Sequence, residues 1–495
     1  MLNKIRPSFA AYKKNLADYS LGCVYTDVCC DMETPVSLFA HLASGENAFL
    51  LESAEGGIRW GRYSFVSPSA AFVLAGGKDY FEVNGKRKNS ADSFADLKKF
   101  ISRYNFPKLE GDAPFTGGAV GYFSYDIAGE WEDIKAPASA ARGEYFRFML
   151  PDIVIVIDHL KKTMRIICWS YGKPHRGKPH RGEGAGERKM YDHAVSKVRK
   201  TLVSIRGSRE LPPQKISGKT SFKSGMTKKR FEDMVRTAKK YITRGDCIQT
   251  VLSRRWTGRL AAEPFSVYRA LRMVNPSPYM YYLKFGGLKI IGSSPEILVR
   301  KDSSRAVLRP IAGTRPRGAT PAEDKKFADE LVASEKERAE HIMLVDLARN
   351  DLGRVCRFNS VSVRELMTVE KFSHVMHMTS EVEGVVRSGH DSFSLFKAAF
   401  PAGTVSGAPK VRAMQIISEL EASPRGPYAG AVGYFSFNGD MDFAITIRTV
   451  FVNGREVSLQ AGAGIVYDST PSGEYRETEN KVKALMRAVE MAEDF

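Results

Sequence analysis

The sequence of this 495-residue chain predicts an α+β fold with antiparallel sheets. Apolar, strand-like segments flank short turns: Phe443–Val452 and Val457–Gln460 bracket Asn453-Gly454, the strongest short signal for a β-hairpin. Long helical periods stand among these segments, as in the apolar stripe that runs from Phe231 to Ile242. This mixture of hairpins and long helices favours an α+β architecture.

In the N-terminal third, the chain shows paired strand signals and one copy of an internal repeat. Ile153–Ile157 is a short apolar strand, and Met164–Trp169 reads as its neighbour after a turn at Asp158–Lys162. The heptapeptide Gly118-Ala-Val-Gly-Tyr-Phe-Ser124 recurs letter for letter at Gly430–Ser436. We therefore expect a duplicated strand in two packed sheets, because the spacing is far too long for a solenoid repeat.

The C-terminal half contains further strands and several long helices. The stripe Phe231, Val235, Ala238 and Ile242 predicts an amphipathic helix that Gly245 closes, and a strand follows near Ile248. Strands at Leu288–Gly292 and Ile297–Arg300 flank a Ser-Ser-Pro turn. Three more helices are expected, at Ser334–Arg349, Val411–Glu421 and Glu474–Glu493.

A change of composition divides the chain. Residues 172–182 contain a tandem KPHRG unit, and residues 204–225 are rich in Lys, Ser, Gly and Pro without an apolar period. This pattern predicts a basic linker or surface loop over residues 172–226, between an N-terminal region of residues 1–171 and a C-terminal region of residues 227–495.

Composition limits the class of protein. The net charge of +18 would attract nucleic acid, anionic lipid or a small polyanionic substrate, and does not choose among them. No segment approaches the ~18 continuous apolar residues of a membrane span, and the N-terminus lacks the apolar core of a signal peptide. The six cysteines show neither CxxC pairs nor zinc spacing. We expect a cytoplasmic protein without disulfides or structural zinc.

Two predicted helices repeat one pattern of acids. Glu337 and Glu340 stand at i, i+3 on the first helix, and Glu474 and Glu477 do so on the last, with Lys481 one turn further along. Magnesium prefers hard oxygen ligands and is usually held by one or two carboxylates together with anionic substrate oxygens. A solvated helix surface is the alternative for either pair alone.

Other segments carry weaker signals. The glycines of residues 461–465 would let backbone N–H groups approach a carboxylate or phosphate, although a tight turn explains them as well. Arg448 lies in an otherwise apolar strand, where a guanidinium needs either an anionic ligand or a structural ion pair. His377, between Met376 and Met378, is either a base or a satisfied core residue.

Together these segments resemble the chorismate-utilising enzymes, and most closely the large, synthase components of anthranilate synthases. The resemblance covers nearly the whole chain. Its motifs are Leu50–Ser53, Gly61–Phe65, Asn275–Met280, Gly292–Glu296, Pro310–Gly318, Glu340–Asp351 and Arg476–Thr478. It implies two antiparallel sheets packed as a sandwich with helices outside, an N-terminal lobe with a regulatory pocket, and a catalytic C-terminal region that shares the sheets.

The resemblance also implies a reaction and its site. Chorismate would bind with Mg²⁺, ammonia would add to the ring, and loss of pyruvate would give anthranilate, the first committed step of tryptophan biosynthesis. Glu296 matches the general acid that protonates the leaving hydroxyl, and His377 is our candidate base for the C2 proton. The remaining site residues that the resemblance implies are the metal ligands Glu340, Glu477, Glu337 and Glu474, the charge-balancing Lys481, and the substrate contacts Tyr428, Arg448, Gly462, Gly464, Thr404, Gly313 and Thr314.

Two positions favour anthranilate over related products. Relatives that add water carry a lysine at the position of Gln249, since water needs a base and ammonia does not. Aminodeoxychorismate synthases commonly carry a nucleophilic lysine where this chain has Ala312, so that product is the alternative that we disfavour. A basic nucleic-acid-binding protein, the reading from another class, would gather basic and aromatic residues on one platform, and the unusual features here are acid pairs and glycines instead.

The resemblance implies two further ligands. No glutaminase nucleophile is recognised, so ammonia would come from a glutamine amidotransferase subunit in a hetero-oligomer. Tryptophan would bind as a feedback inhibitor, and neither nucleic acid nor a membrane is expected as a partner. The predicted tryptophan site consists of Glu52, Ser53, Pro278, Tyr279 and Met280. The KPHRG repeat departs from the family pattern and has no assigned role.

Overall fold

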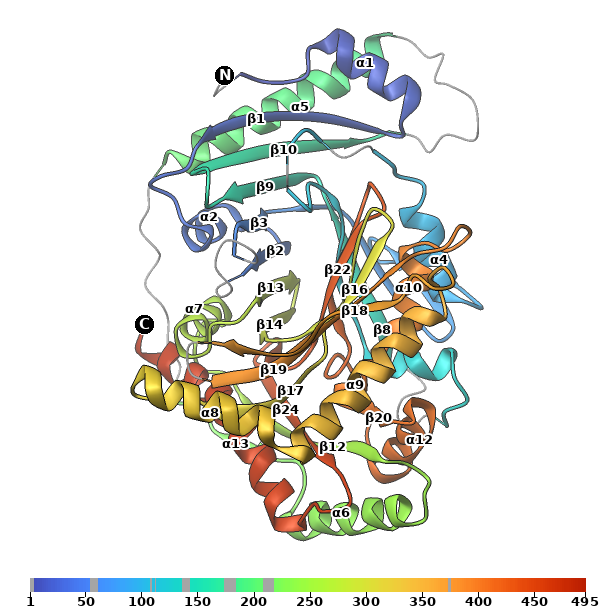
Figure 1. The fold of residues 1–495 in the computed structure, drawn as a ribbon. Helices are drawn as coiled ribbons and strands as arrows, with labels where there is room; N and C mark the ends of the chain where they lie inside the picture. The colour runs from blue at the N-terminus through green and yellow to red at the C-terminus, as the bar shows by residue number, and fades with distance from the viewer. Residues whose placement is uncertain are drawn as a thin grey trace.

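The computed structural model describes residues 4–53, 61–106, 109–111, 113–135, 143–172, 184–207, 218–372 and 375–495. Two large sheets, in which every paired neighbour is antiparallel, face each other with helices on their outer sides (Figure 1). Phe65 of the first sheet meets Tyr434 of the second, with ring centroids 6.4 Å apart, in the aromatic core between them. The predicted α+β sandwich is thus confirmed.

The first sheet contains strands from both halves of the chain. Its spatial order is β1 (Leu21–Cys29), β10 (Thr163–Tyr171), β9 (Ile153–Asp158), β3 (Tyr63–Ser67), β2 (Asn47–Glu52), β13 (Tyr279–Phe285), β14 (Leu288–Ser294), β23 (Thr449–Asn453), β24 (Glu456–Ile465), β12 (Gln249–Arg259) and β11 (Phe222–Ser224), and β20 (Gly407–Ala408) also pairs with β12. The predicted hairpin at Asn453-Gly454 joins β23 to β24, and β9 pairs with β10 as expected.

The second sheet is equally mixed. Its order is β17 (Ile311–Pro316), β19 (Val375–Val385), β16 (Arg305–Leu308), β15 (Ile297–Asp302), β22 (Met441–Ile445), β21 (Ala431–Ser436), β7 (Gly118–Phe123), β8 (Glu144–Pro151), β4 (Ala70–Gly77), β5 (Tyr80–Val83) and β6 (Lys86–Asn89), and β18 (Ser362–Lys371) also pairs with β19. Because each sheet draws strands from residues before and after the predicted linker, neither half of the chain has a sheet of its own.

The internal repeat occupies one sheet, and the prediction that its copies belong to two packed sheets is wrong. β7 and β21 are neighbours, and Gly121 pairs with Gly433 at the centre of a local two-fold arrangement. A Cβ atom at Gly121 would lie 2.1 Å from the Arg147 carbonyl oxygen, and one at Gly433 would lie 2.0 Å from that of Asp442. The repeated glycines therefore let each copy approach the strand on its other side.

The helices cover the outer faces. On the first sheet, and beside it, lie α1 (Phe9–Asp18), α2 (Pro35–Leu42), α5 (Gly184–Ile205), α7 (Pro264–Val274), α6 (Lys228–Thr243) and α13 (Pro471–Met491). The second sheet carries α4 (Ser93–Ile101), α8 (Pro321–Ala333), α9 (Glu335–Gly353) and α10 (Ser392–Ala399), whereas α11 (Gly403–Ser406) and α12 (Lys410–Leu420) pack against β12 and β20 of the first sheet. The predicted helices of the C-terminal half are confirmed as α6, α9, α12 and α13.

The linker predicted over residues 172–226 is wrong for much of its length. Residues Gly184–Ile205 form α5, whose buried Ala194 and Val198 pack on the outer face of the first sheet. Phe222–Ser224 adds the edge strand β11. The sequence signal for this helix is weak, because only the stripe that faces the sheet needs to be apolar and the other positions are polar. The KPHRG repeat lies outside the described residues.

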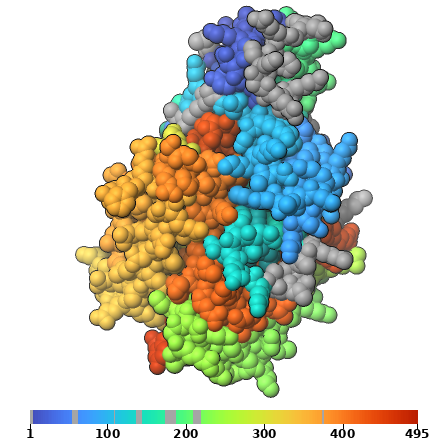
Figure 2. All heavy atoms as spheres, turned by 90° about the vertical axis from the view of Figure 1, so that its right-hand side faces the viewer, coloured from blue at the N-terminus to red at the C-terminus, as the bar shows by residue number. Residues whose placement is uncertain are grey.

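Segments that are distant in sequence pack together. Figure 2 shows the light-blue segment near residue 90 against the orange segment near residue 390, where Phe94 of α4 contacts Phe393 and Phe396 of α10. All six cysteines are free thiols. Within the described part of the chain, no helix combines the length and the apolar character that crossing a bilayer requires.

Candidate functional site

A cavity of about 600 Å³ lies where strands of both sheets meet α9 and α13. Its wall draws on β12, β17, β19, β24, α9, α11, α13 and the loops that connect the two sheets. All the active-site residues predicted from the sequence line it: Gln249, Glu296, Gly313, Thr314, Glu337, Glu340, His377, Thr404, Tyr428, Arg448, Gly462, Gly464, Glu474, Glu477 and Lys481. The structure thus brings together residues that are spread along the sequence from Gln249 to Lys481.

Two adjacent crossovers between the sheets place Glu296 and Arg448. The chain leaves the first sheet after β14 and enters the second at β15, and it makes the reverse passage between β22 and β23. Hydrogen bonds join the crossovers: Ser294 Oγ donates to the Ile445 carbonyl at 2.7 Å, and Ile445 N donates to the Glu296 carbonyl at 3.0 Å. Both side chains are therefore held on one rigid junction.

The predicted continuous strand at Phe443–Val452 is wrong. It is interrupted after Ile445, and Arg448 adopts a left-handed φ of 51°, which only a specific local environment makes tolerable. Periodicity could not reveal the interruption, because apolar residues flank it on both sides. The break directs the guanidinium into the cavity, where its Nη1 also donates to the Lys481 carbonyl at 2.8 Å.

The carboxyl group of Glu296 is buried and protonated at neutral pH. Burial raises its pKa from 4.5 to about 8, while the Thr404 hydroxyl and the Lys481 ammonium oppose the shift. An acid whose pKa lies near the working pH is still protonated when the substrate binds, and it releases its proton readily enough to transfer it. This carboxyl group can therefore serve as a general acid.

The four glutamates of α9 and α13 face the same cavity. Burial and the neighbouring Glu337 raise the pKa of Glu340, and burial raises that of Glu474. Glu477 pairs with the Lys481 ammonium at 2.6 Å, and Glu337 pairs with Arg315 at 3.1 Å. Facing acids that raise one another's pKa create a site of negative potential in which a cation is favoured.

The glutamates of this cavity suit a metal ion that is held jointly by the protein and by its substrate. Among the described residues, no group of three or more His, Cys, Asp or Glu side chains is arranged to hold a metal ion by itself. Magnesium needs fewer protein ligands when a substrate supplies oxygens. The Oε2 atom of Glu474 is buried without a hydrogen-bond partner among the described residues. Acid side chains with an unused oxygen suit an ion that binds together with an anionic substrate.

The glycines of residues 461–465 lie within β24, so the expectation of a tight turn is wrong. A Cβ atom at Gly464 would lie 2.5 Å from Gln249 Nε2, and one at Gly462 would lie 2.8 Å from the Tyr428 hydroxyl oxygen. The glycines therefore give space to the two cavity side chains. β23 pairs with β24 only as far as Leu459, so one edge of residues 460–465 has no strand partner in the described structure, and Lys481 Nζ donates to the Gly462 carbonyl at 3.0 Å.

His377 lies on β19 opposite a bulge of β17. Its Nδ1 lies 3.0 Å from the Gly313 carbonyl oxygen and 3.1 Å from the Thr314 hydroxyl. A carbonyl can only accept a hydrogen bond, so a neutral ring carries its proton on Nδ1 and its lone pair on Nε2. Gly313 has a φ of 69°, and a Cβ atom there would lie 2.9 Å from Glu337 Oε2. The ring can therefore accept a proton at Nε2.

Two buried oxygens in this cavity lack a hydrogen-bond partner among the described residues: Gln249 Oε1 and Glu474 Oε2. Buried polar atoms are normally satisfied, so orphaned atoms in one cavity indicate a missing ligand. The sequence reasoning also missed Lys336, which lines the cavity and whose charge partly opposes the burial that raises the pKa of Glu340 and Glu474. Its i, i+4 spacing from Glu340 was the available signal.

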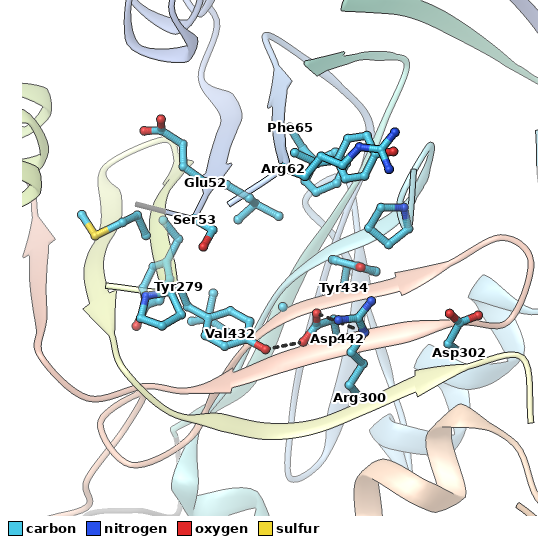
Figure 3. A pocket seen from close by; sticks show the side chains of 17 residues that line it. Glu52, Ser53, Arg62, Phe65, Tyr279, Arg300, Asp302, Val432, Tyr434 and Asp442 are labelled. Carbon is cyan, nitrogen blue, oxygen red and sulfur yellow. Dashed lines mark hydrogen bonds and ion pairs between the residues drawn. The ribbon is translucent and has the colours of Figure 1, made fainter. Parts of the chain in front are cut away.

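A second cavity, of about 280 Å³, lies between the sheets near β2 and β13. All five residues of the predicted tryptophan site line it: Glu52, Ser53, Pro278, Tyr279 and Met280. Figure 3 shows Ser53 directed into the cavity and Glu52 directed away from Arg300 and Asp442. The Glu52 carboxylate instead pairs with Arg272 at 3.1 Å and accepts a hydrogen bond from Tyr268. Burial raises its pKa above the ordinary value, and Arg272 and Tyr268 oppose that shift.

Comparison with known proteins identifies relatives along almost the whole chain. Residues 46–487 match the family of chorismate binding enzymes. Anthranilate synthase component 1 from Aquifex aeolicus is 45% identical over 98% of this chain and 98% of its own length. The protein of the same name from Acetivibrio thermocellus is 43% identical over 98% of this chain and 99% of its own length.

Solved structures show the same fold. Anthranilate synthase component I from Streptococcus pneumoniae, 38% identical, superposes with a TM-score of 0.73 over 86% of this chain and 92% of that chain. The menaquinone-specific isochorismate synthase MenF from Escherichia coli, 19% identical, superposes with a TM-score of 0.70 over 98% of this chain and 100% of that chain. At this lower identity the likeness concerns the fold alone.

Proposed function

Because the chain belongs to the family of chorismate binding enzymes, we propose that this enzyme is the synthase component of an anthranilate synthase. It converts chorismate and ammonia to anthranilate and pyruvate, the first committed step of tryptophan biosynthesis. The observation that supports this most is the single cavity in which a protonated buried acid, a guanidinium and two pairs of glutamates meet.

Binding begins with the two carboxylates of the substrate. Arg448 offers a planar guanidinium that can bind one carboxylate with two parallel hydrogen bonds. The Tyr428 hydroxyl, whose pKa burial raises to about 12, stays protonated and can donate to the same group. The open edge of β24 beside Gly462 and Gly464 supplies backbone donors without a side chain in the way. These groups orient the ring between Glu296 and His377.

The second carboxylate of the substrate faces the acids. Glu340 and Glu477 would hold Mg²⁺, with Glu337 and Glu474 as closely placed partners, and Lys481 balances the charge. When bound, the ion neutralises the substrate carboxylate and anchors it. Without a cation, these glutamates would repel a dianionic substrate. We therefore expect the chain to need a divalent cation for substrate binding.

Proton transfers then follow from the positions of two side chains. Glu296 is held protonated by burial and donates its proton to the departing ring hydroxyl as ammonia adds to C2. His377, with its Nδ1 proton directed to the Gly313 carbonyl, accepts the C2 proton at Nε2 as pyruvate leaves. Gln249 cannot act as a base for water, and Ala312, which also lines the cavity, cannot act as a nucleophile.

The proposal extends to a partner and a regulator. Ammonia would be supplied by a separate glutamine amidotransferase subunit in a hetero-oligomer. Tryptophan would occupy the second cavity, in which Ser53 offers a hydroxyl and the aromatic and apolar wall suits an indole. Binding there would lower synthesis as the end product accumulates.

Identifying the reaction product tests the proposed function. The purified chain is mixed with chorismate, Mg²⁺ and ammonium, and the products are separated and identified by fluorescence and mass. We expect anthranilate and pyruvate in equal amounts, and none when the divalent cation is chelated. Aminodeoxychorismate as the final product would support the alternative synthase, and isochorismate would overturn the assignment of ammonia as the nucleophile.

A further inference from the structure

Arg254 on β12 is a fully buried cation outside the cavity wall, with 2% of its surface exposed. No carboxylate in the described ranges pairs with it: Nη1 donates to Thr478 Oγ1 at 3.1 Å, and Nη2 donates to Ser224 Oγ at 3.1 Å. Its Nε atom has no hydrogen-bond partner among those residues. Burying a charge without a counter-ion is costly, so another factor must favour arginine at this position.

Three aromatic rings surround the guanidinium. Its Cζ atom lies 3.8 Å from the ring centroid of Tyr475 and 4.7 Å from that of Trp256, and Phe231 of α6 completes the group at 5.7 Å. A planar guanidinium stacks on such rings and keeps its donors in a fixed fork, which a lysine cannot reproduce. The side chain is therefore clamped in one orientation.

Arg254 and the three rings around it, here called the clamp, contact the N-terminal part of α13. Thr478 accepts from Arg254, and its hydroxyl donates to the Tyr475 carbonyl at 2.7 Å. Tyr475 and Thr478 are one turn apart on one side of the helix, and each directly follows a glutamate of the cavity, Glu474 or Glu477. The contacts of Arg254 with Tyr475 and Thr478 therefore fix the orientation of this helical turn, which carries Glu474 and Glu477, and its distance from β12.

The same strand connects the clamp to the cavity. Side chains alternate between the two faces of a strand, so Arg254 points to the face opposite Gln249 and Val251, both of which line the cavity. In Figure 1, α13 lies beside β12 and β24, with α6 beyond it. Arg254 thus links β12, which forms part of the cavity wall, to the helix that carries Glu474 and Glu477.

We propose that Arg254 is a positioning residue that holds Glu474 and Glu477 at the correct distance from β12 for cation binding. This inference rests on the proposed function, because the cation site belongs to it. Supports of this kind act on metal affinity through the ligands that they orient, and their loss typically weakens binding about 10- to 100-fold. A residue that only stabilised the fold would leave the cation affinity of the folded protein unchanged.

The test measures cation affinity separately from activity. Free Mn²⁺ is followed by electron paramagnetic resonance with the full chain and chorismate, without ammonium or glutamine, so that the proposed nucleophile is absent. The variants are Arg254→Met, Arg254→Lys and the milder Thr478→Val. The matched control is Val489→Ala, which creates a cavity in the buried C-terminal part of the same helix. Thermal unfolding is recorded for each variant.

We expect Arg254→Met to raise the Mn²⁺ dissociation constant at least about tenfold. Arg254→Lys should raise the Mn²⁺ dissociation constant less than Arg254→Met does, and Thr478→Val should also raise it. Val489→Ala should leave the Mn²⁺ dissociation constant unchanged although it lowers the thermal stability. The KM for chorismate at limiting Mg²⁺ should rise in parallel and recover at saturating Mg²⁺.

The possible outcomes separate the two proposals. Parental Mn²⁺ affinity in folded Arg254→Met, or in Thr478→Val if the methionine variant does not fold, would overturn the positioning role and leave the proposed function intact. Equal effects of Val489→Ala and Arg254→Met would also overturn it. If the parental chain bound no Mn²⁺ and made no anthranilate, the proposed function itself would fail, and the positioning role would fail with it.

Discussion

Replacing Glu296 with glutamine should weaken catalysis and stabilise the protein in the same pH range. The change keeps the size of the side chain and removes its ionisation. In the parental chain, the folded-state pKa of about 8 lies above the ordinary value of 4.5 because burial disfavours the carboxylate. The unfolded chain releases this proton at lower pH than the folded chain, so the stability that this group contributes is complete below pH 4.5 and is lost as the pH rises to about 8.

The size of the effect follows from the two pKa values. At 1.36 kcal/mol per pKa unit, the raised pKa of Glu296 lowers the free energy of unfolding by about 3 kcal/mol at pH 7, where only the unfolded chain has released this proton, and by about 5 kcal/mol well above pH 8. Glutamine avoids this cost, so the stability difference between variant and parent should rise from near zero at pH 4.5 to these values. Loss of a general acid should lower kcat about 10²- to 10⁴-fold.

Chemical unfolding at several pH values between 4.5 and 9 measures the first effect, and the initial rate of anthranilate formation measures the second. The parental rate should fall as the pH rises through about 8, where Glu296 loses its proton. A glutamine variant that is no more stable than the parent at pH 8, or that keeps the parental rate, would refute the buried-acid reasoning.

Three other substitutions probe separate parts of the account. His377→Met removes the base at Nε2, so elimination should slow and an aminated intermediate that still carries the pyruvyl group should accumulate in quenched samples examined by mass spectrometry; anthranilate formation at the parental rate would exclude the role. Arg448→Lys loses the bidentate contact, so initial-rate measurements should give a chorismate KM raised at least about tenfold, and an unchanged KM would count against a carboxylate contact at this position. Ser53→Ala should relieve inhibition by tryptophan in the same rate assay without abolishing synthesis, whereas full inhibition of the variant would remove Ser53 from the regulatory site.

The residues that face the cavity could be predicted because each belongs to a short segment with a distinctive composition. The acid pairs, the glycines of residues 461–465, Arg448 and His377 were recognisable locally. The resemblance added Gln249, Glu296 and Thr404 and assigned all of them to one site. The long helices were also predictable: α9 begins after Ser334 as expected, and α13 begins at Pro471, three residues before the predicted start at Glu474. Local patterns and the family resemblance together therefore predicted the candidate site.

Features that depend on pairing across the sandwich could not be predicted. The two copies of the repeat pair with each other, and nothing in either copy specifies its neighbour. The crossover at Arg448 interrupts an apolar run only because the chain changes sheets there. The ion pair of Glu52 with Arg272 joins β2 to α7, which are far apart in sequence. Tertiary contacts, rather than local propensity, determine these features.

Locating a cation and chorismate together in the folded chain tests the central claim most directly. A crystal structure with chorismate and Mn²⁺, in which anomalous scattering identifies the ion, would show whether the four glutamates, Arg448 and Glu296 serve one site. We predict that Mn²⁺ lies in the cavity within bonding distance of Glu340 and Glu477 and of a substrate carboxylate, with the other carboxylate at Arg448. An ion or a substrate bound elsewhere on the protein would contradict the account.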